Sequence, residues 1–137
     1  MAEVVVNGTV SAPLEKVWAI VRDFGDLSWA RIHDTKLEGE GVGAVRTFTS
    51  TGGDLVVQER LEHLDEAAHH LSYSLIDAGV IPWTSYLAHI RLSSVDGHTH
   101  VEWWGTFEPR NVTEEQASGI VRSIYENGIR SLQRATA

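Results

Sequence analysis

Apolar residues recur at helical spacing over one long stretch near the end of the chain, residues 113 to about 135. Thr113 and Gln116 form a capping box, the pattern that starts a helix. The Thr113 hydroxyl can accept from the Gln116 N–H, and the Gln116 side chain can accept from the Thr113 N–H. Apolar positions three and four residues apart predict one broad buried face, made of Ala117, Ile120, Val121, Ile124, Gly128, Ile129 and Leu132. Gly119 and Gly128 interrupt the helix. They are interpreted either as tolerated small residues or, at Gly128 on the apolar face, as space left for a neighbouring group.

The chain before this helix reads mostly as strand. Residues 4–10 are β-branched and predict a first strand. Pro13 then starts a helix with an apolar face of Leu14, Val17, Trp18 and Val21, and a second short helix is expected over residues 27–30. A strand near residues 35–40 follows. From Gly43 onward, turn signals at residues 51–54, 64–67, 77–79 and 95–98 separate antiparallel strands. The pattern predicts one domain, residues 1–137, in which a sheet wraps around the last helix.

Two predicted hairpins determine which strand residues face each other. With Asp96-Gly97 as a two-residue loop, one face is apolar and pairs Leu92 with Val101, Ile90 with Trp103, Ala88 with Gly105, and Tyr86 with Phe107. The opposite face is polar and pairs Arg91 with Glu102, His89 with Trp104, and Ser93 with His100. With Gly52-Gly53 as the loop, Arg46 faces Glu59 and Phe48 faces Val57. By parity, Tyr73 and Leu75 join the same inner face.

This register brings an arginine and a glutamate together in apolar surroundings. An unpaired charge there costs several kcal/mol, so Arg46 and Glu59 require each other or a polar ligand. They are interpreted either as a structural ion pair that closes the end of the sheet or as a polar anchor inside a ligand cavity. Tyr73 and Tyr86 carry the same two interpretations, core packing or ligand contact.

Composition narrows the function classes. The 137 residues carry a net charge of −8, which argues against nucleic acid and anionic membrane surfaces as partners. Cysteine is absent, so disulfides, thiolate metal sites and cysteine nucleophiles are excluded. Met1 runs directly into a predicted strand and no apolar run approaches a membrane span, so a cytoplasmic location is expected. Five tryptophans are many for this length and indicate either core packing or an aromatic cavity.

No motif in the sequence supports a metal, hydrolase or dinucleotide site. His98 and His100 share a strand face, but His89 lies roughly 13 Å from His100 along the strands, too far to share an ion. The chain has no Gly-x-Ser-x-Gly elbow. A dinucleotide fingerprint requires a helix directly after its glycines, and no helix follows Gly39, Gly41 and Gly43. Neither a metal nor a cofactor is expected.

The order of the predicted elements resembles the START/Bet v 1-like (SRPBCC) superfamily, in particular its bacterial polyketide cyclase/dehydrase-like branch. The matching stretches are residues 12–18, 41–46, 59–65 and 101–107, Tyr86 after Pro82, and Ile124-Tyr125 with Gly128. The resemblance implies an α+β helix-grip fold: a curved seven-stranded antiparallel sheet wrapped around a long C-terminal helix, with two short helices after the first strand. It also implies a hydrophobic cavity between sheet and helix. Members bind lipids, sterols, polyketides or plant hormones, and some catalyse cyclisation or dehydration.

Plant abscisic acid receptors look similar in fold. Their Glu-Arg-Leu stretch supplies a cavity glutamate, which corresponds here to Glu59, and their cavity tyrosine and serine correspond to Tyr86 and Ala88. The Leu-Pro of their gate loop is absent from residues 50–54, and their latch motif is replaced at residues 80–83. The resemblance therefore implies a cavity with a mobile rim rather than a hormone receptor.

We expect the protein to bind a small, largely apolar molecule, lipid-, polyketide- or aromatic-like, with one polar or anionic end. Arg46, alone or through water with Glu59, would meet the polar end, and Gly52-Gly53 with Pro82-Trp83 would form the rim. The expected ligand-contacting residues are Arg46, Phe48, Val57, Glu59, Tyr73, Trp83, Tyr86, Ala88, Trp103, Phe107, Ile120, Ile124 and Gly128. The protein is expected to be a monomer or weak homodimer.

Two alternatives remain open. In the first, a cofactor-independent cyclase or dehydratase uses Glu59 as general acid/base while Tyr73 or Tyr86 polarises a carbonyl. Arg46 opposite Glu59 favours the ionised carboxylate, so catalysis ranks below binding. In the second, the domain binds a partner protein without a cavity. That role requires an exposed apolar patch, whereas the expected outer face is polar except at Leu87 and Trp104.

Overall fold

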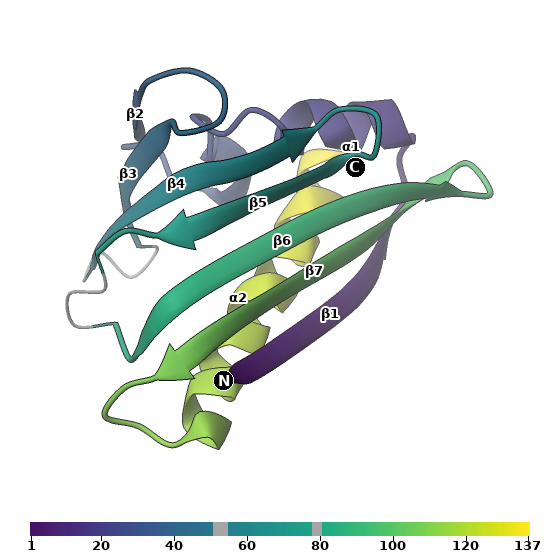
Figure 1. The fold of residues 1–137 in the computed structure, drawn as a ribbon. Coiled ribbons are helices and arrows are strands. Elements are labelled where there is room, and N and C mark those ends of the chain that lie inside the picture. The colour runs from purple at the N-terminus through teal and green to yellow at the C-terminus, as the bar shows by residue number, and fades with distance from the viewer. Residues whose placement is uncertain (51–54, 78–80) are drawn as a thin grey trace.

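A computed structural model describes residues 1–50, 55–77 and 81–137 of the chain. The described residues form one antiparallel sheet of seven strands, in the order β1-β7-β6-β5-β4-β3-β2, which curves around a long helix (Figure 1). The strands are β1 (Ala2–Val10), β2 (Lys36–Glu38), β3 (Val45–Thr49), β4 (Val56–Asp65), β5 (His70–Leu75), β6 (Trp83–Val95) and β7 (His98–Pro109). The helix-grip α+β fold expected from the sequence is confirmed.

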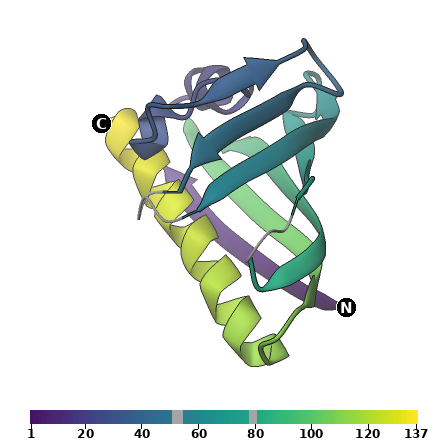
Figure 2. The same ribbon diagram turned by 90° about the vertical axis from the view of Figure 1, so that its left-hand side faces the viewer.

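The long helix α2 (Glu114–Ala135) crosses the concave face of the sheet (Figure 2). Thr113 caps it as predicted: its hydroxyl accepts from the Gln116 N–H, and the Gln116 side chain accepts from the Thr113 N–H. Helix α1 (Leu14–Val21) packs at one end of the sheet, where Trp18 Nε1 donates to Glu66 Oε1 at 2.7 Å.

The second short helix expected at residues 27–30 is only a single 3-10 turn, η1 (Ser28–Ala30). Its start is held by Asp26, whose carboxylate accepts the Ser28 N–H at 2.8 Å. Its end is set by Arg31, which adopts a left-handed conformation with φ 62°. The chain between Asp26 and Arg31 is long enough for one 3-10 turn and too short for an α-helix.

The hairpin between β6 and β7 has the predicted register over most of its length. Asp96 and Gly97 form the two-residue loop, with φ 53° and 81°, and the pairs Leu92–Val101, Ile90–Trp103 and Ala88–Gly105 are confirmed. The outer-face pairs Arg91–Glu102, His89–Trp104 and Ser93–His100 are also confirmed. The ion pair predicted between Arg91 and Glu102 forms at 2.6 Å.

The predicted pairing of Tyr86 directly with Phe107 is wrong. The β6–β7 register shifts between Thr84 and Leu87, so that one extra residue of β6 is accommodated, and Ser85 takes φ 52°. Such a bulge bends a strand and increases its twist, which suits a strongly curved sheet. Tyr86 still points inward and is only 6% exposed.

The pairing of β3 with β4 follows the prediction, with Arg46 opposite Glu59 and Phe48 opposite Val57. Tyr73 and Leu75 join from β5, where they face Leu61 and Glu59. The turns expected at residues 51–54 and 77–79 lie wholly or largely outside the described residues, as does the expected Gly52-Gly53 rim.

The buried face of α2 differs from the prediction on one side. Its buried apolar residues are Ala117, Val121, Tyr125, Ile129 and Leu132. Ile120 and Ile124, expected on this face, are each 45% exposed. The predicted stripe is wider than the strip of helix that the sheet contacts, so these two residues lie on its flank, and Tyr125 occupies the centre.

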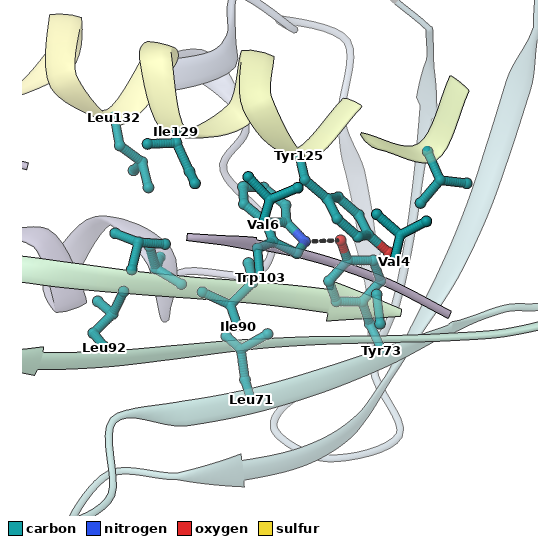
Figure 3. Close-up of a cluster of buried hydrophobic side chains, with 14 of the residues drawn as sticks. Val4, Val6, Leu71, Tyr73, Ile90, Leu92, Trp103, Tyr125, Ile129 and Leu132 are labelled. Carbon is teal, nitrogen blue, oxygen red and sulfur yellow. Dashed lines mark hydrogen bonds between the residues drawn. The ribbon is translucent and has the colours of Figure 1, made fainter. Parts of the chain in front are cut away.

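Helix and sheet approach closely at two glycines. The Trp103 ring of β7 lies over Gly128 of α2, and a side chain there would overlap it. The Tyr125 hydroxyl of α2 lies over Gly105 of β7, where a side chain would likewise overlap. The two rings stack on each other with centroids 5.3 Å apart (Figure 3). The predicted space at Gly128 therefore exists, and it is filled by Trp103.

The two helix glycines should respond oppositely to alanine. Gly128→Ala should destabilise the fold by about 1–3 kcal/mol, because the new methyl group displaces Trp103. Gly119 has open space around it, so Gly119→Ala should stabilise the fold by up to about 1 kcal/mol through helix propensity. Urea denaturation of the two variants measures both changes, and stabilisation by both substitutions would contradict the packing described.

Candidate functional site

A cavity of about 220 Å³ lies between the inner face of the sheet, α2 and the segment that contains η1. Most of its wall is apolar or aromatic. The lining residues are Val21, Leu27, Trp29, Ala30, Ile32, Arg46, Phe48, Glu59, Leu71, Tyr73, Ile90, Trp103, Ile124, Asn127, Gly128 and Ser131.

The floor of the cavity comes from the central strands. Leu71 and Tyr73 project from β5, Ile90 from β6 and Trp103 from β7, all toward α2 (Figure 3). Trp103 Nε1 donates to the Tyr73 hydroxyl at 3.1 Å, so the two largest floor residues hold each other in place. The confirmed strand register therefore determines which side chains face the cavity.

The more exposed lining residues lie on α2 and around η1. Ile124 and Asn127 are exposed on α2, and Trp29, Ala30 and Ile32 are half-buried on the opposite side. The Trp29 indole donates to the Asp26 carbonyl at 3.1 Å, which holds the ring beside the cavity. We refer to these five residues as the mouth.

Arg46 and Glu59 form an ion pair in the cavity wall. Arg46 Nε donates to Glu59 Oε1 at 2.8 Å, and Arg46 Nη2 lies 2.7 Å from the same oxygen. The side chains are only 10% and 11% exposed. Arg46 Nη1 also donates to the Phe24 carbonyl at 3.3 Å. This pairing meets the requirement that a buried charge has an opposite charge and hydrogen-bond partners.

Aromatic rings surround the guanidinium group. Arg46 Cζ lies 4.0 Å from the ring centroid of Phe24, 5.0 Å from that of Tyr73 and 5.8 Å from that of Phe48. Guanidinium groups favour such positions because the ring faces carry negative charge density. These rings fix the position of the arginine.

The three tyrosines of the chain lie close together beside this site. The hydroxyls of Tyr86 and Tyr125 are 2.5 Å apart. Burial raises the pKa of Tyr73, and the nearby Glu59 charge raises it further. Burial is also the main cause that raises the pKa of Tyr86 and of Tyr125. All three therefore stay neutral at ordinary pH.

Seven of the thirteen residues expected from the sequence to contact a ligand line this cavity. The residues that line it are Arg46, Phe48, Glu59, Tyr73, Trp103, Ile124 and Gly128. The expected residues that do not line it are Val57, Trp83, Tyr86, Ala88, Phe107 and Ile120.

Most of the expected residues that do not line the cavity are packed in the core. Trp83, Tyr86 and Phe107 form their own ring cluster, with centroids 5.9–6.3 Å apart. Ala88 is fully buried between Tyr73 and Gly105 on the neighbouring strands. These residues share the inner face with the cavity but fill the core beside it.

The η1 side of the cavity was not anticipated. The connection between α1 and β2 supplies this side through Leu27, Trp29, Ala30 and Ile32. The sequence predicts a short helix over residues 27–30 there but no contact with a cavity. The available signal was the apolar character of this connection, since a surface loop rarely carries three large apolar residues so close together.

The outer face of the sheet carries a histidine pair that sequence spacing missed. His70 Nε2 lies 3.0 Å from His89 Nδ1, and the His89 ring stacks on Trp104 with centroids 4.6 Å apart. Burial lowers the pKa of both imidazoles. Within residues 1–50, 55–77 and 81–137, no group of three or more histidine, cysteine or acidic residues is arranged to hold a metal ion. None of the helices in this described part is both long and apolar enough to cross a bilayer.

Comparisons with known proteins agree with this architecture. A family model described as "Polyketide cyclase / dehydrase and lipid transport" matches residues 1–137. An uncharacterised protein from Bacillus thuringiensis shares 30% identity at a TM-score of 0.88, with 98% of each chain covered. The protein XoxI from Bacillus cereus shares 31% identity at a TM-score of 0.88, covering 99% of this chain and 96% of that one. A protein from Nitrosospira multiformis shares 27% identity at a TM-score of 0.83, covering 98% and 96%.

The buried tyrosines predict a simple titration. The folded protein should show no tyrosinate absorbance near pH 10, where exposed tyrosines ionise, because burial raises all three pKa values. Their contribution to stability is fully present below about pH 10 and is lost as the pH rises further, since the unfolded chain then releases protons that the folded protein retains. Ultraviolet titration with and without concentrated urea measures this. Reversible ionisation of a tyrosine near pH 10 in the folded protein would contradict it.

Proposed function

Because the chain belongs to the polyketide cyclase/dehydrase and lipid transport family, we propose that it binds a small hydrophobic molecule with a polar end in the cavity between the sheet and α2. The observation that carries the proposal is a mostly apolar cavity of about 220 Å³ that contains one ion pair, Arg46–Glu59. Ligand sites are typically apolar with a few convergent polar groups of this kind.

Cavity size narrows the ligand. At about 220 Å³ the cavity is smaller than the roughly 300–1,000 Å³ usual for drug-sized ligands. In this form it accepts a molecule of one or two rings. A longer lipid or polyketide chain requires the mouth to open between Trp29 and Ile124. The ring faces of Phe48, Tyr73 and Trp103 provide the apolar contacts.

The proposal also covers the domain organisation, the location in the cell and the oligomeric state. The chain acts as one START/Bet v 1-like domain, residues 1–137, in the cytoplasm, without a cofactor, nucleic acid or membrane insertion. A monomer or weak homodimer is supported by the edge strand β1, whose Val5 and Thr9 carbonyls accept hydrogen bonds from Arg122 and Gln133 of α2. Edge carbonyls engaged in this way are less available for pairing with a second sheet.

The alternative function is a cyclase or dehydratase that uses the same cavity. It is favoured by the description of the family and by the position of Glu59 beside Tyr73 in the cavity wall. Glu59 would then transfer the proton and Tyr73 would polarise a carbonyl. Tyr86 is less suited to this role, because its hydroxyl is bonded to Tyr125 and lies outside the cavity wall.

Binding should depend on free space at the mouth. Native mass spectrometry and thermal-shift assays with one- and two-ring aromatic compounds should identify a ligand, and Ala30→Trp should weaken its binding at least tenfold by occupying the mouth. Ala67→Trp, in an exposed turn away from the cavity, is the matched control and should bind normally. Absence of both a copurifying molecule and any thermal shift across the library would refute the binding proposal.

The alternative is tested by separating binding from turnover. If the protein is an enzyme, Glu59→Gln should abolish water loss from a poly-β-keto thioester while the thioester still binds. Calorimetry measures binding, and mass spectrometry of the products measures turnover. A wild-type protein that binds the thioester and leaves it unchanged would exclude this reaction.

A further inference from the structure

The charges inside the cavity limit which ligands it accepts, and this inference rests on the proposed function. Of the described residues that line the cavity, Arg46 and Glu59 are the charged ones, and they contact each other at 2.7 Å. Their charges therefore cancel within the wall. A free arginine attracts carboxylates, whereas this arginine is already neutralised by the protein.

Arg46 is already paired with a negative charge of the protein. Its Nε and Nη2 lie 2.8 and 2.7 Å from Glu59 Oε1, and its Nη1 donates to the Phe24 carbonyl at 3.3 Å. Nε and Nη1 each donate one hydrogen bond to a protein oxygen, and Nη2 makes a close ion-pair contact with Glu59 Oε1, so the hydrogens of the two Nη atoms are only partly used. The rings of Phe24, Tyr73 and Phe48 surround the group as well. A ligand carboxylate at the remaining N–H groups would approach an arginine whose charge Glu59 already neutralises.

Glu59 has the opposite property. Both Arg46 contacts go to its Oε1, and no hydrogen bond to Oε2 is found among residues 1–50, 55–77 and 81–137. An ionised carboxylate only accepts hydrogen bonds. A hydrogen bond to a carboxylate is stronger in a mostly apolar cavity than in bulk water, so a ligand that donates to Oε2 gains affinity there. A ligand carboxylate would instead place a second negative charge beside Glu59.

We propose that the cavity selects neutral hydrogen-bond donors, phenols or alcohols of one or two rings, and rejects carboxylates of the same size. The ligand hydroxyl donates to Glu59 Oε2, and its ring lies against Tyr73 and Trp103. In this proposal Glu59 binds a neutral donor, whereas the expectation from the sequence has Arg46 meet a polar or anionic end.

Four naphthalenes of similar size test this selection at pH 7 by isothermal titration calorimetry. 2-Naphthol donates a hydrogen bond, 2-methoxynaphthalene only accepts, naphthalene does neither, and 2-naphthoate is an anion. We expect 2-naphthol to bind about ten- to a hundredfold more tightly than naphthalene or 2-methoxynaphthalene, as a hydrogen bond to a charged group provides. 2-Naphthoate should bind more weakly than naphthalene.

Variants of the ion pair should change the selection in a defined way. Glu59→Gln removes the negative charge and leaves Arg46 unbalanced, so 2-naphthoate should gain at least tenfold while the advantage of 2-naphthol falls. If that variant does not fold, the double variant R46M/E59L removes both charges. It should bind naphthalene and 2-naphthol within about threefold of each other. The control is Glu102→Gln, which breaks the Arg91–Glu102 pair on the outer face and should leave the wild-type order of affinities.

The outcomes separate the two proposals. Tight binding of 2-naphthoate by the wild-type protein, or equal binding of 2-naphthol and 2-methoxynaphthalene, would overturn the selection of neutral donors while supporting a ligand cavity. Failure of all four compounds to bind would overturn this inference, whereas the proposed function fails only if no molecule copurifies and no compound of the wider library shifts the melting temperature. Preference for 2-naphthol that is lost in R46M/E59L and retained in Glu102→Gln would support both.

Discussion

The fold depends on a reciprocal contact between α2 and β7. Each element carries a glycine that receives an aromatic side chain of the other: Gly128 receives Trp103, and Gly105 receives Tyr125. The rings then stack with centroids 5.3 Å apart. This arrangement sets both the distance between helix and sheet and the position of the helix along its axis, because a shift by one residue would place a side chain where a ring must lie.

The cavity follows from the same contact. Trp103 fills the space beneath Gly128 and at the same time forms part of the cavity floor, where it donates to Tyr73. Of the α2 residues that line the cavity, Asn127, Gly128 and Ser131 are small or polar, and the larger Ile124 lies at the mouth, so the helix does not fill the space next to η1. A tightly packed half of the core thus lies beside a half that keeps room for a ligand.

The chemistry of the candidate site follows from the way Arg46 and Glu59 neutralise each other. The pair is formed through one carboxylate oxygen, and the other has no hydrogen-bond partner among the described residues. In an apolar interior, a hydrogen bond to a charge is strengthened by the low local polarity, and an unmatched charge is penalised for the same reason. The proposed preference for a neutral donor follows from that balance.

The sequence by itself determined the register of β3 with β4, that of β6 with β7 from Ala88 to Val101, the capped C-terminal helix and the Arg46–Glu59 pairing. Each of these rests on local periodicity or on turn chemistry such as Asp96-Gly97. Only the tertiary structure decided which part of the inner face is packed core and which part is cavity. It did so because Tyr86 and Phe107 have the same strand parity as the cavity residues Ile90 and Trp103, and only their packing against Trp83 and each other separates them. The η1 wall, the exposed Ile120 and the shared Oε1 of Glu59 depend on contacts between segments far apart in the chain, which no local pattern encodes.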